Sequence, residues 1–404
     1  MGSDVSLVSG PPAGVGGPVP PRTVTPVDRA SQAHASQTGW AVGDRTAFEP
    51  PPRLVDGAIL VLVGLEVVSG LVSLVAGTPD WAWLFAAHAI GGLSLVVLVG
   101  WKLRRVLPGL RRPSSRPDGV GVSVLLATLA IAALGTGIAW AILDLVRISG
   151  FTLLTIHMGL GLLVGGVLVW HLRHRFRLPR QRDVEGRRTM LQFAGTVGVG
   201  ALTWRLQDAL GGLAGLGGSP DRFTGSERAG GAGNEFPVTS WVADDPEPVD
   251  PAEWRLAVGG AVREPASFAV ADLTDDAERV GFETDAGETA VLDCTSGWYA
   301  DRHWQGVRVG DLLERVGPTA DGRWVRVVSV TGYRWSFPLA EARDFLLATR
   351  VGGEPLSHGH GAPLRLVAPG RRGFQWVKWI DRVEVTRHRD LSQWLAIFVS
   401  GFVE

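Results

Sequence analysis

The sequence contains little cysteine, tyrosine or net charge. Its 404 residues include 1 Cys and 2 Tyr, and the formal net charge is -1. A lone cysteine forms no intramolecular disulfide, so Cys294 is an inert buried thiol, a nucleophile or a metal-bound thiolate. The net charge is near zero, and no cluster of basic residues is interleaved with aromatic ones. We therefore expect no nucleic-acid binding. No Walker sequence and no Gly-rich phosphate loop after a strand occur, which disfavours nicotinamide and nucleotide chemistry.

Long apolar runs fill the first half of the chain. A Gly- and Pro-rich tail over residues 1–52 comes first, and its composition predicts disorder because it buries too little apolar surface. We then predict a membrane bundle of about five transmembrane helices over residues 53–210, since a span needs roughly 20 apolar residues. The five stretches are Leu54 to Ala76, Trp81 to Leu103, Val120 to Leu143, Phe151 to Leu172 and Thr189 to about Leu206.

Basic residues predict how this bundle is oriented. The connection from Lys102 to Arg116 carries six Lys or Arg, and that from Arg173 to Arg188 carries seven. By the positive-inside rule both face the cytoplasm, so the C-terminal half is expected outside a bacterial-type cytoplasmic membrane. The run Gly-Arg-Arg-Thr-Met-Leu-Gln at residues 186–192 is similar to a twin-arginine export signal placed internally, or adds two cytoplasmic charges.

Two histidines lie inside predicted spans, where ionisable side chains are costly and usually functional. His88 and His157 each follow the outer end of a span by six or seven residues, which places both roughly 10 Å below the outer surface. This matched depth suits the two axial ligands of one b-type haem, although structural histidines remain an alternative. Glu66 is either a proton-uptake group near a quinone site or hydrogen-bonded to a neighbouring helix. Glycines expected to leave room for the haem are Gly91, Gly92, Gly159 and Gly161.

The second half follows a Gly-rich linker over residues 211–233 and has an α+β pattern. Short alternating segments predict strands, whereas 309–316 and 338–349 predict helices. We therefore expect a multi-domain protein, an N-terminal all-α transmembrane bundle followed by an α+β domain over 234–390 with mixed strands. Residues 391–404 predict an amphipathic segment on the membrane or on the domain. The predicted strands are Trp254 to Val258, Trp324 to Val330, Leu364 to Val367 and Ile380 to Val385.

Three motifs carry a family resemblance. Val-Leu-Asp-Cys-Thr-Ser-Gly-Trp-Tyr surrounds Cys294, and Gly-Ala-Pro-Leu-Arg-Leu-Val-Ala-Pro begins at Gly361. Gly-Phe-Gln-Trp-Val-Lys-Trp closes the set from Gly373. Together they resemble the sulfite oxidase superfamily of molybdopterin oxidoreductases over roughly residues 234–388, and within it the periplasmic protein-methionine-sulfoxide reductase branch. The resemblance implies an α+β molybdopterin-binding fold and an enzyme.

The resemblance also implies roles for individual residues. The Cys294 thiolate matches the family cysteine that ligates molybdenum beside the pterin dithiolene, and a soft thiolate suits that metal. The pterin phosphate needs Arg, Lys and N–H donors. By themselves, the residues also allow a surface strand position for Arg365 and a core position for Trp376. Matches to family cofactor contacts are Arg365, Lys378, Trp376, Val377, His360, which stands where the reductase branch has Asn, and the weaker Asn234.

The substrate stays open between two branches of this family. A pocket for a small dianion, as in the sulfite-oxidising branch, needs several cations. A thioether or sulfoxide pocket instead needs aromatic walls. The chain ends about 25 residues after Lys378, without the extra dimerisation domain of the oxidising branch, which favours the reductase-like branch. The candidate cations are Arg302, His303, Arg334, Arg371 and Arg372, the last two also candidate cofactor contacts, and the candidate aromatics are Trp298, Tyr299, Trp304 and Trp335.

These observations combine into one expected function. We predict a membrane-anchored molybdopterin-dependent oxidoreductase that transfers an oxygen atom from a sulfoxide-like substrate. A haem b in its own bundle relays electrons from a quinone pool or another redox partner, and membrane lipid surrounds the helices. The alternatives are a sulfite dehydrogenase running in the oxidising direction and a non-catalytic membrane haem or binding protein.

Overall fold

The computed structural model describes residues 50–110, 120–143, 145–175, 187–213, 222–240, 244–274, 276–282 and 286–399. Residues Pro50–Glu404 form one compact unit. The predicted disordered tail lies almost wholly outside the described residues, as do most of the two basic connections between helices.

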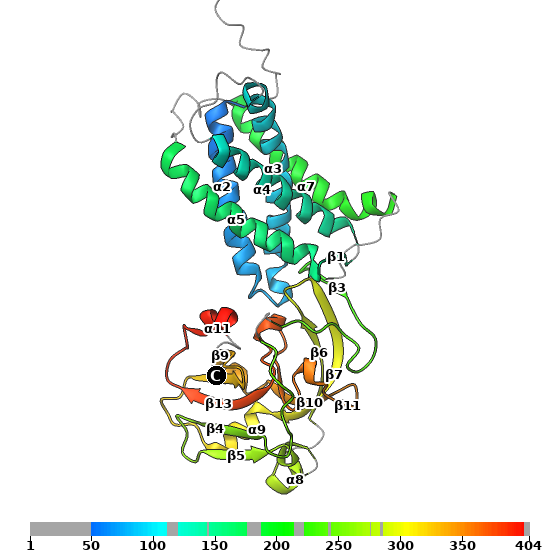
Figure 1. Cartoon of the computed structure of the whole chain (residues 1–404), viewed down its shortest axis with the longest axis vertical. Coiled ribbons are helices and arrows are strands. Elements are labelled where there is room, and N and C mark those ends of the chain that lie inside the picture. The colour runs from blue at the N-terminus through cyan, green and yellow to red at the C-terminus, as the bar shows by residue number, and fades with distance from the viewer. Residues whose placement is uncertain are drawn as a thin grey trace, which may run out of the picture. The chain divides into compact units, whose positions relative to one another are not determined.

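Long helices make up the first half of the described chain and lie side by side in Figure 1. Four of them are long and apolar enough to cross a membrane: α2, α3 with the short turn η1 before it, α4 and α5. The helix α7 contains the fifth predicted stretch and does not belong to this group. The bounds are Pro52–Ser73 for α2, Pro79–Trp81 for η1, Ala82–Leu110 for α3, Val120–Ile142 for α4, Leu153–Arg175 for α5 and Arg187–Leu213 for α7.

Continuous apolar runs explain these helices, because a helix satisfies its own backbone where no water is present. Proline at the start of α2 suits a first helical turn, which has no N–H partners to lose. Helix α4 packs on α5, α2 on α3, and α3 on α7. A two-stranded hairpin joins α4 to α5, formed by β1 (Arg147–Ile148) and β2 (Phe151–Thr152).

The second half is built on two mixed sheets. In the larger, β11, β10, β7 and β3 follow in order, while β12 also pairs with β10 and β6 with β7. Only the pairing of β3 with β7 is parallel in this sheet. The bounds are Glu227–Arg228 for β3, Gly287–Asp293 for β6, Trp298–Arg308 for β7, Leu346–Val351 for β10, Glu354–Pro355 for β11 and Arg365–Val367 for β12.

The smaller sheet has the order β5, β4, β13, β8, β9, with β13 and β4 parallel. Its strands are β4 (Arg255–Gly260), β5 (Ala266–Ala269), β8 (Trp324–Ser329), β9 (Arg334–Pro338) and β13 (Ile380–Thr386). Short helices connect the strands: η3 (Ala271–Leu273), α8 (Ala277–Val280), α9 (Val309–Val316), α10 (Leu339–Ala342), η4 (His358–His360), η5 (Gly373–Gln375) and α11 (Gln393–Val399).

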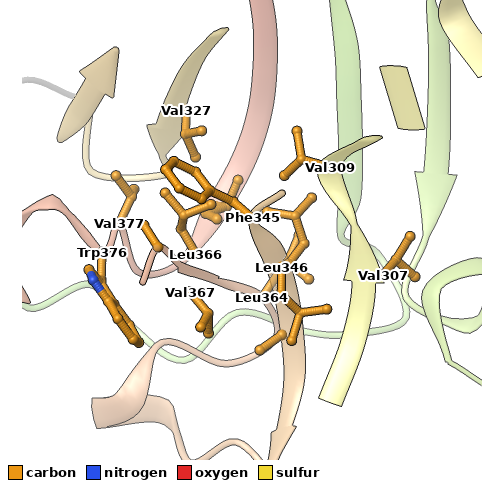
Figure 2. Close-up of a cluster of buried hydrophobic side chains, with 14 of the residues drawn as sticks. Val307, Val309, Val327, Phe345, Leu346, Leu364, Leu366, Val367, Trp376 and Val377 are labelled. Atoms are coloured by element: carbon orange, nitrogen blue, oxygen red, sulfur yellow. The ribbon is translucent and has the colours of Figure 1, made fainter. Parts of the chain in front are cut away.

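The buried apolar residues described in this half form a continuous core. Figure 2 shows part of it, where side chains from β7, β8, β10 and β12 meet those that precede β13. Helix α9 contributes Val309, Leu312, Leu313 and Val316, whose spacing gives the helix one apolar face. The expected α+β fold behind an all-α region is confirmed.

One sequence-based prediction is wrong. Residues 338–349 were expected to form one helix, but only Leu339–Ala342 is helical and Leu346–Val351 is the strand β10. Strand β10 pairs with β7, β11 and β12 and is buried at five of its six positions. A strand buried on both faces reads as a continuous apolar run, which sequence periodicity does not separate from a helix.

Candidate functional site

Cys294 lies at the tip of the hairpin that joins β6 to β7. Its N–H donates to the carbonyl of Trp298 at 2.8 Å, and the N–H of Gly297 donates to the carbonyl of Cys294 at 3.1 Å. Gly297 has a φ of 96°, which glycine adopts without strain. The thiol is buried, and Ser296 Oγ lies 3.0 Å from its Sγ. The turn therefore holds the sulfur in one place and offers a hydroxyl that can donate to a thiolate.

A buried carboxylate anchors this hairpin from behind. Asp293, 2% exposed, forms an ion pair with Arg372 at 2.9 Å. Arg372 also donates to the carbonyl of Cys294 at 3.3 Å. Burial lowers the pKa of Arg372, and the charge of Asp293 opposes that shift. Further hydrogen bonds to the Asp293 carboxylate come from Thr224 at 2.8 Å, Ser226 at 2.7 Å and Arg222 at 3.1 Å.

A cavity of about 230 Å³ opens beside Cys294. Five of the residues proposed from the sequence to hold molybdenum or the pterin line it, although up to 84 positions separate them along the chain: Cys294, His360, Arg365, Trp376 and Lys378. Strand β12 begins at Arg365 in the larger sheet, and Lys378 precedes β13 in the smaller one, so both sheets contribute. The other wall residues that matter below are Phe236, Asp244, Trp298, Tyr333, Phe374 and Ile397.

Arg365 supplies the most buried cation of the cavity. It is 3% exposed, donates to the carbonyl of His360 at 3.0 Å, and lies over the ring of Trp304 at 5.0 Å. Burial lowers the pKa of Arg365 to about 9, so the guanidinium stays charged at neutral pH. Its Nε has no hydrogen-bond partner within the described part of the chain. A buried donor in this condition is costly unless an anionic ligand binds it.

Lys378 supplies the second cation. Its Nζ donates to Ser240 Oγ at 2.6 Å and to the carbonyl of Gly359 at 3.0 Å. Burial, and then repulsion from Arg365, lower the pKa of Lys378 to about 7, while Asp244 opposes the shift. An anion in the cavity would stabilise the charged form of this lysine.

His360 is neutral in this arrangement. Burial lowers its pKa to about 4. Nε2 lies 3.0 Å from the carbonyl of Phe236 and must donate to it, which leaves Nδ1 to accept from Ser357 Oγ at 2.7 Å. Both ring nitrogens are thus engaged by the protein, so His360 shapes the cavity wall.

The remaining proposed cofactor contacts lie outside the cavity wall. Asn234 binds the chain near β11, donating to the carbonyl of Pro355 at 2.9 Å and accepting from the N–H of Ser357 at 2.9 Å. Val377 is 1% exposed and belongs to the core in Figure 2. Arg371 pairs with Glu341, and Arg372 pairs with Asp293.

Two titratable residues of the cavity, Asp244 and Tyr333, were not predicted from the sequence. Tyr333 donates its hydroxyl to the carbonyl of Phe374 at 2.5 Å, and burial raises its pKa. Burial also raises the pKa of Asp244, against the effects of Thr331 and Lys378. The rarity of tyrosine could have drawn attention to Tyr333, since the chain has only 2 Tyr. Nothing in the sequence around Asp244 marks it among the 40 acidic residues.

Of the four aromatics proposed for a sulfur pocket, Trp298 lines the cavity. Trp304 lies beneath Arg365, Trp335 packs against Phe374 and Trp394, and Tyr299 contacts Arg222 and Arg228. None of the five candidate cations for a dianion lines this cavity in the described part of the chain. Besides Arg371 and Arg372, which are described above, each of the other three has a partner of its own. Arg334 pairs with Asp390, and His303 forms a hydrogen bond with Thr289. Arg302 donates to backbone carbonyls.

The two bundle histidines face one another. The ring centres of His88 and His157 are 6.1 Å apart and their planes are at 89°. Nδ1 of His88 lies 2.9 Å from Glu66 Oε2 and 2.8 Å from Ser69 Oγ, and Nδ1 of His157 lies 2.8 Å from the carbonyl of Ala133. Within the described part of the chain, the hydrogen bonds of both rings thus involve Nδ1. This pattern is usual for imidazoles whose Nε2 ligates a metal.

Two glycines make room for these polar groups. A Cβ at Gly91 would lie 2.0 Å from the Glu66 carboxylate, and one at Gly137 would lie 2.9 Å from the His157 ring. Gly159 and Gly161 have open space around them. Metal–imidazole bonds of about 2 Å place the ring centres of two axial ligands on the order of 6 Å apart, so the observed separation is compatible with an iron between them.

No group of three or more His, Cys, Asp or Glu side chains in the described residues is arranged to hold a metal ion. A metal at Cys294 would therefore have fewer than three ligands of these types among the described residues, which leaves coordination positions for an organic cofactor. A thiol, two cations and an unpartnered guanidinium N–H around one cavity fit a metal carried by an anionic organic cofactor.

Comparisons with known proteins agree with this chemistry. Residues 243–394 match a family model described as the oxidoreductase molybdopterin binding domain. The uncharacterized oxidoreductase YuiH of Bacillus subtilis is 31% identical over 162 residues, which are 39% of this chain and 78% of YuiH. The chain belongs to this family. It is a molybdopterin-binding oxidoreductase of the sulfite oxidase family, so the sequence-based identification of family, fold and enzyme class is confirmed.

The chain is also similar to enzymes that act on sulfur compounds by name. The protein-methionine-sulfoxide reductase catalytic subunit MsrP of Xanthomonas axonopodis pv. citri is 29% identical over 35% of this chain and 47% of MsrP. Human mitochondrial sulfite oxidase is 33% identical over 30% of this chain and 24% of that enzyme. The chain thus spans about half of the length of MsrP and about a quarter of the length of human sulfite oxidase.

Proposed function

We propose that this protein is a membrane-anchored reductase that removes the oxygen atom from uncharged sulfoxides, with electrons delivered from a quinol through one haem b in its helical bundle. The cavity beside Cys294 supports the first part of this proposal, and the facing histidines support the second.

Residues of the cavity divide into those that hold the cofactor and those that meet the substrate. Cys294 would ligate molybdenum, and Arg365 and Lys378 would bind the phosphate of the pterin. Trp376, which packs beside Arg365, would bound the pterin on one side. Asn234 would act indirectly, because it fixes the chain that leads to His360.

The reaction consumes two electrons and two protons for each sulfoxide, and yields a thioether and water. Bound molybdenum supplies a centre that exchanges an oxygen atom and two electrons with the substrate. The protein contributes groups that hold protons near the cavity. Asp244 retains its proton to a higher pH than an ordinary carboxyl, and the Tyr333 hydroxyl stays protonated because burial raises its pKa.

The observation that favours a sulfoxide is that the candidate dianion-binding side chains do not line the cavity. All five candidates for binding a small dianion are engaged elsewhere, and the two cations that line the cavity are those assigned to the pterin. The walls that remain are mostly apolar, with Trp298, Phe236 and Phe374. Sulfur packs well against aromatic rings, and an uncharged substrate needs no counter-ion.

The bundle supports membrane anchoring and a haem. Large apolar side chains on its helices are exposed, as at Leu65 and Leu162, each 57%. Such exposure suits helices surrounded by lipid. His88 and His157 would be the axial ligands of the haem, which accepts electrons singly. Oxidation of one quinol supplies the two electrons of each turnover and releases two protons.

Metal analysis and an optical spectrum of the full-length, detergent-solubilised protein test this proposal. We expect molybdenum and haem near one each, and quinol-dependent reduction of a dialkyl sulfoxide. The Cys294→Ser variant should lose molybdenum and sulfoxide reduction together while keeping the haem spectrum. Oxidation of sulfite without sulfoxide reduction would overturn the substrate assignment. Molybdenum without haem would overturn the electron route and leave the catalytic domain as described.

A further inference from the structure

The turn that carries Cys294 contacts the helical bundle directly. Thr152, 4% exposed, donates from Oγ1 to the carbonyl of Ser296 at 2.7 Å. The same hydroxyl accepts the N–H of Thr155, so it also caps the first turn of α5. One side chain therefore connects the start of α5 to the residue whose hydroxyl lies 3.0 Å from the cysteine sulfur.

A tryptophan of α4 completes the contact. Trp140, 6% exposed, donates from Nε1 to the carbonyl of Gly225 at 3.0 Å. Its ring lies against Gly297 so closely that a Cβ there would be 2.4 Å from the indole. Leu154 of α5 would also lie 3.1 Å from that Cβ. Gly297 thus permits both its turn and the approach of the bundle.

Helix α3, which carries His88, also contacts a segment that positions Cys294. Phe85 of α3 makes an edge-to-face contact with Phe223, with ring centres 5.6 Å apart. Phe223 stands between Arg222 and Thr224, which both bind the Asp293 carboxylate. His88 follows Phe85 by three residues, on the same face of α3. Hence α3, α4 and α5 all contact the segments that position Cys294.

We propose that Thr152 and Trp140 dock the cysteine turn onto the bundle and so position the molybdenum site for electron transfer from the histidine site. His157 follows Thr152 by five residues, which is roughly 7.5 Å along a helix. The route from His157 through Thr152 and Ser296 to Cys294 consists of covalent bonds and hydrogen bonds. This inference rests on the proposed haem. Each electron moves from the reduced bundle site to the cavity, and quinol is the reductant.

Cross-linking tests the contact without reference to either cofactor. A photo-reactive amino acid at Leu154 of the full-length protein should be captured by the peptide that contains Gly297. The same group at Leu162, which is 57% exposed on the same helix, should not reach that peptide. Capture of the Gly297 peptide only from position 162, or from neither position, would overturn the docking.

Stopped-flow spectroscopy tests the function of the contact. The haem is first reduced, a dialkyl sulfoxide is added, and haem reoxidation is followed. We expect Thr152→Val to slow reoxidation about fivefold. Loss of one hydrogen bond of ordinary net strength weakens the docking equilibrium by about that factor. Thr152→Ser should restore the rate because it keeps the hydroxyl. Trp140→Phe should slow it similarly, since the ring stays and the N–H is lost.

Controls separate this inference from the proposed function. Thr196→Val is a matched change, because Thr196 is also 4% exposed and its hydroxyl donates within its own helix to the carbonyl of Gln192. It should leave the rate unchanged. Molybdenum content, the haem spectrum and sulfoxide reduction with an artificial dye should be normal in every variant. Unchanged reoxidation in both Thr152→Val and Trp140→Phe would overturn the inference, whereas absence of haem from the unaltered protein would overturn the proposed function first.

Discussion

Two neighbouring arginines show how burial sets the energy of an ion pair. Arg372 and Asp293 are each 3% exposed in their side chains, and the pair lies directly behind Cys294. Arg371 and Glu341 form a pair that is about one third exposed, at 29% and 33%. Removing one partner of a buried pair leaves an uncompensated charge, whereas water compensates an exposed one.

We therefore predict that Asp293→Asn destabilises the catalytic domain by about 3–5 kcal/mol. The amide keeps the size of the carboxylate but leaves the charges of Arg372 and Arg222 unpaired. Glu341→Gln, at the neighbouring exposed pair, should cost about 0–1 kcal/mol. Thermal unfolding in detergent measures both variants, and equal shifts in Tm would show that burial does not decide the effect.

The second prediction at this scale concerns Lys378 and pH. Burial lowers its pKa to about 7, so the ammonium is charged below pH 7 and loses its proton above it. Binding of an anionic phosphate favours the charged form. Affinity of the cofactor-free protein for molybdopterin should therefore be highest below pH 7 and fall above it, by up to about tenfold per pH unit.

Reconstitution of the cofactor-free protein between pH 6 and 9 measures this dependence. Lys378→Arg should flatten the profile, because arginine keeps its charge throughout that range. Lys378→Met should bind weakly at every pH. A profile for the unaltered protein that rises with pH would contradict the prediction.

Among the elements, α11 has the most direct effect on the shape of the cavity. Ile397 of α11 lines the cavity, and Trp394 packs against Trp335 and Phe374. Gln393, which is fully buried, accepts the N–H of Ser336 in β9 at 2.9 Å. The expected amphipathic C-terminal segment thus lies, in its described part, on the catalytic domain and closes one side of the cavity.

Loss of that anchor should open the cavity. We predict that Gln393→Ala costs about 1–3 kcal/mol, because it leaves a buried strand N–H unpaired. Molybdenum should then leave the variant faster than the unaltered protein during dialysis against a chelator. Leu395→Ala is the control, since Leu395 is 65% exposed on the same helix and should retain the metal normally. Equal retention in the two variants would show that α11 does not close the cofactor site.

For the whole molecule, the decisive feature is the separation of two redox sites on one chain. Substituting alanine for His88 or His157 should abolish the b-type haem absorbance and sulfoxide reduction with quinol. Molybdenum content and reduction driven by an artificial dye should persist, because no described residue of the bundle lines the cavity. A variant of either histidine that keeps both the haem absorbance and quinol-driven activity would contradict the proposed ligation.

The sequence motifs identify candidate residues but do not show which of them line the cavity. Cys294, Arg365 and Lys378 belong to runs with distinctive composition, and the fold brings them to one cavity. Arg371 and Arg372 belong to the same runs, yet both pair with acids outside the cavity wall. Asp244 and Tyr333 carry no local pattern that marks them. The direction of a side chain depends on strand pairing and on partners distant in sequence, which a motif does not contain.

By itself, the sequence determined the class of each half of this protein. Long apolar runs dictate helices that satisfy their own backbone, and alternating short segments dictate strands around a mixed core. Only the tertiary structure decided that residues 346–351 form a strand, that the candidate anion-binding arginines point elsewhere, and that Thr152 meets Ser296. Local patterns fix the burial of a segment, whereas contacts between segments depend on packing across the whole chain.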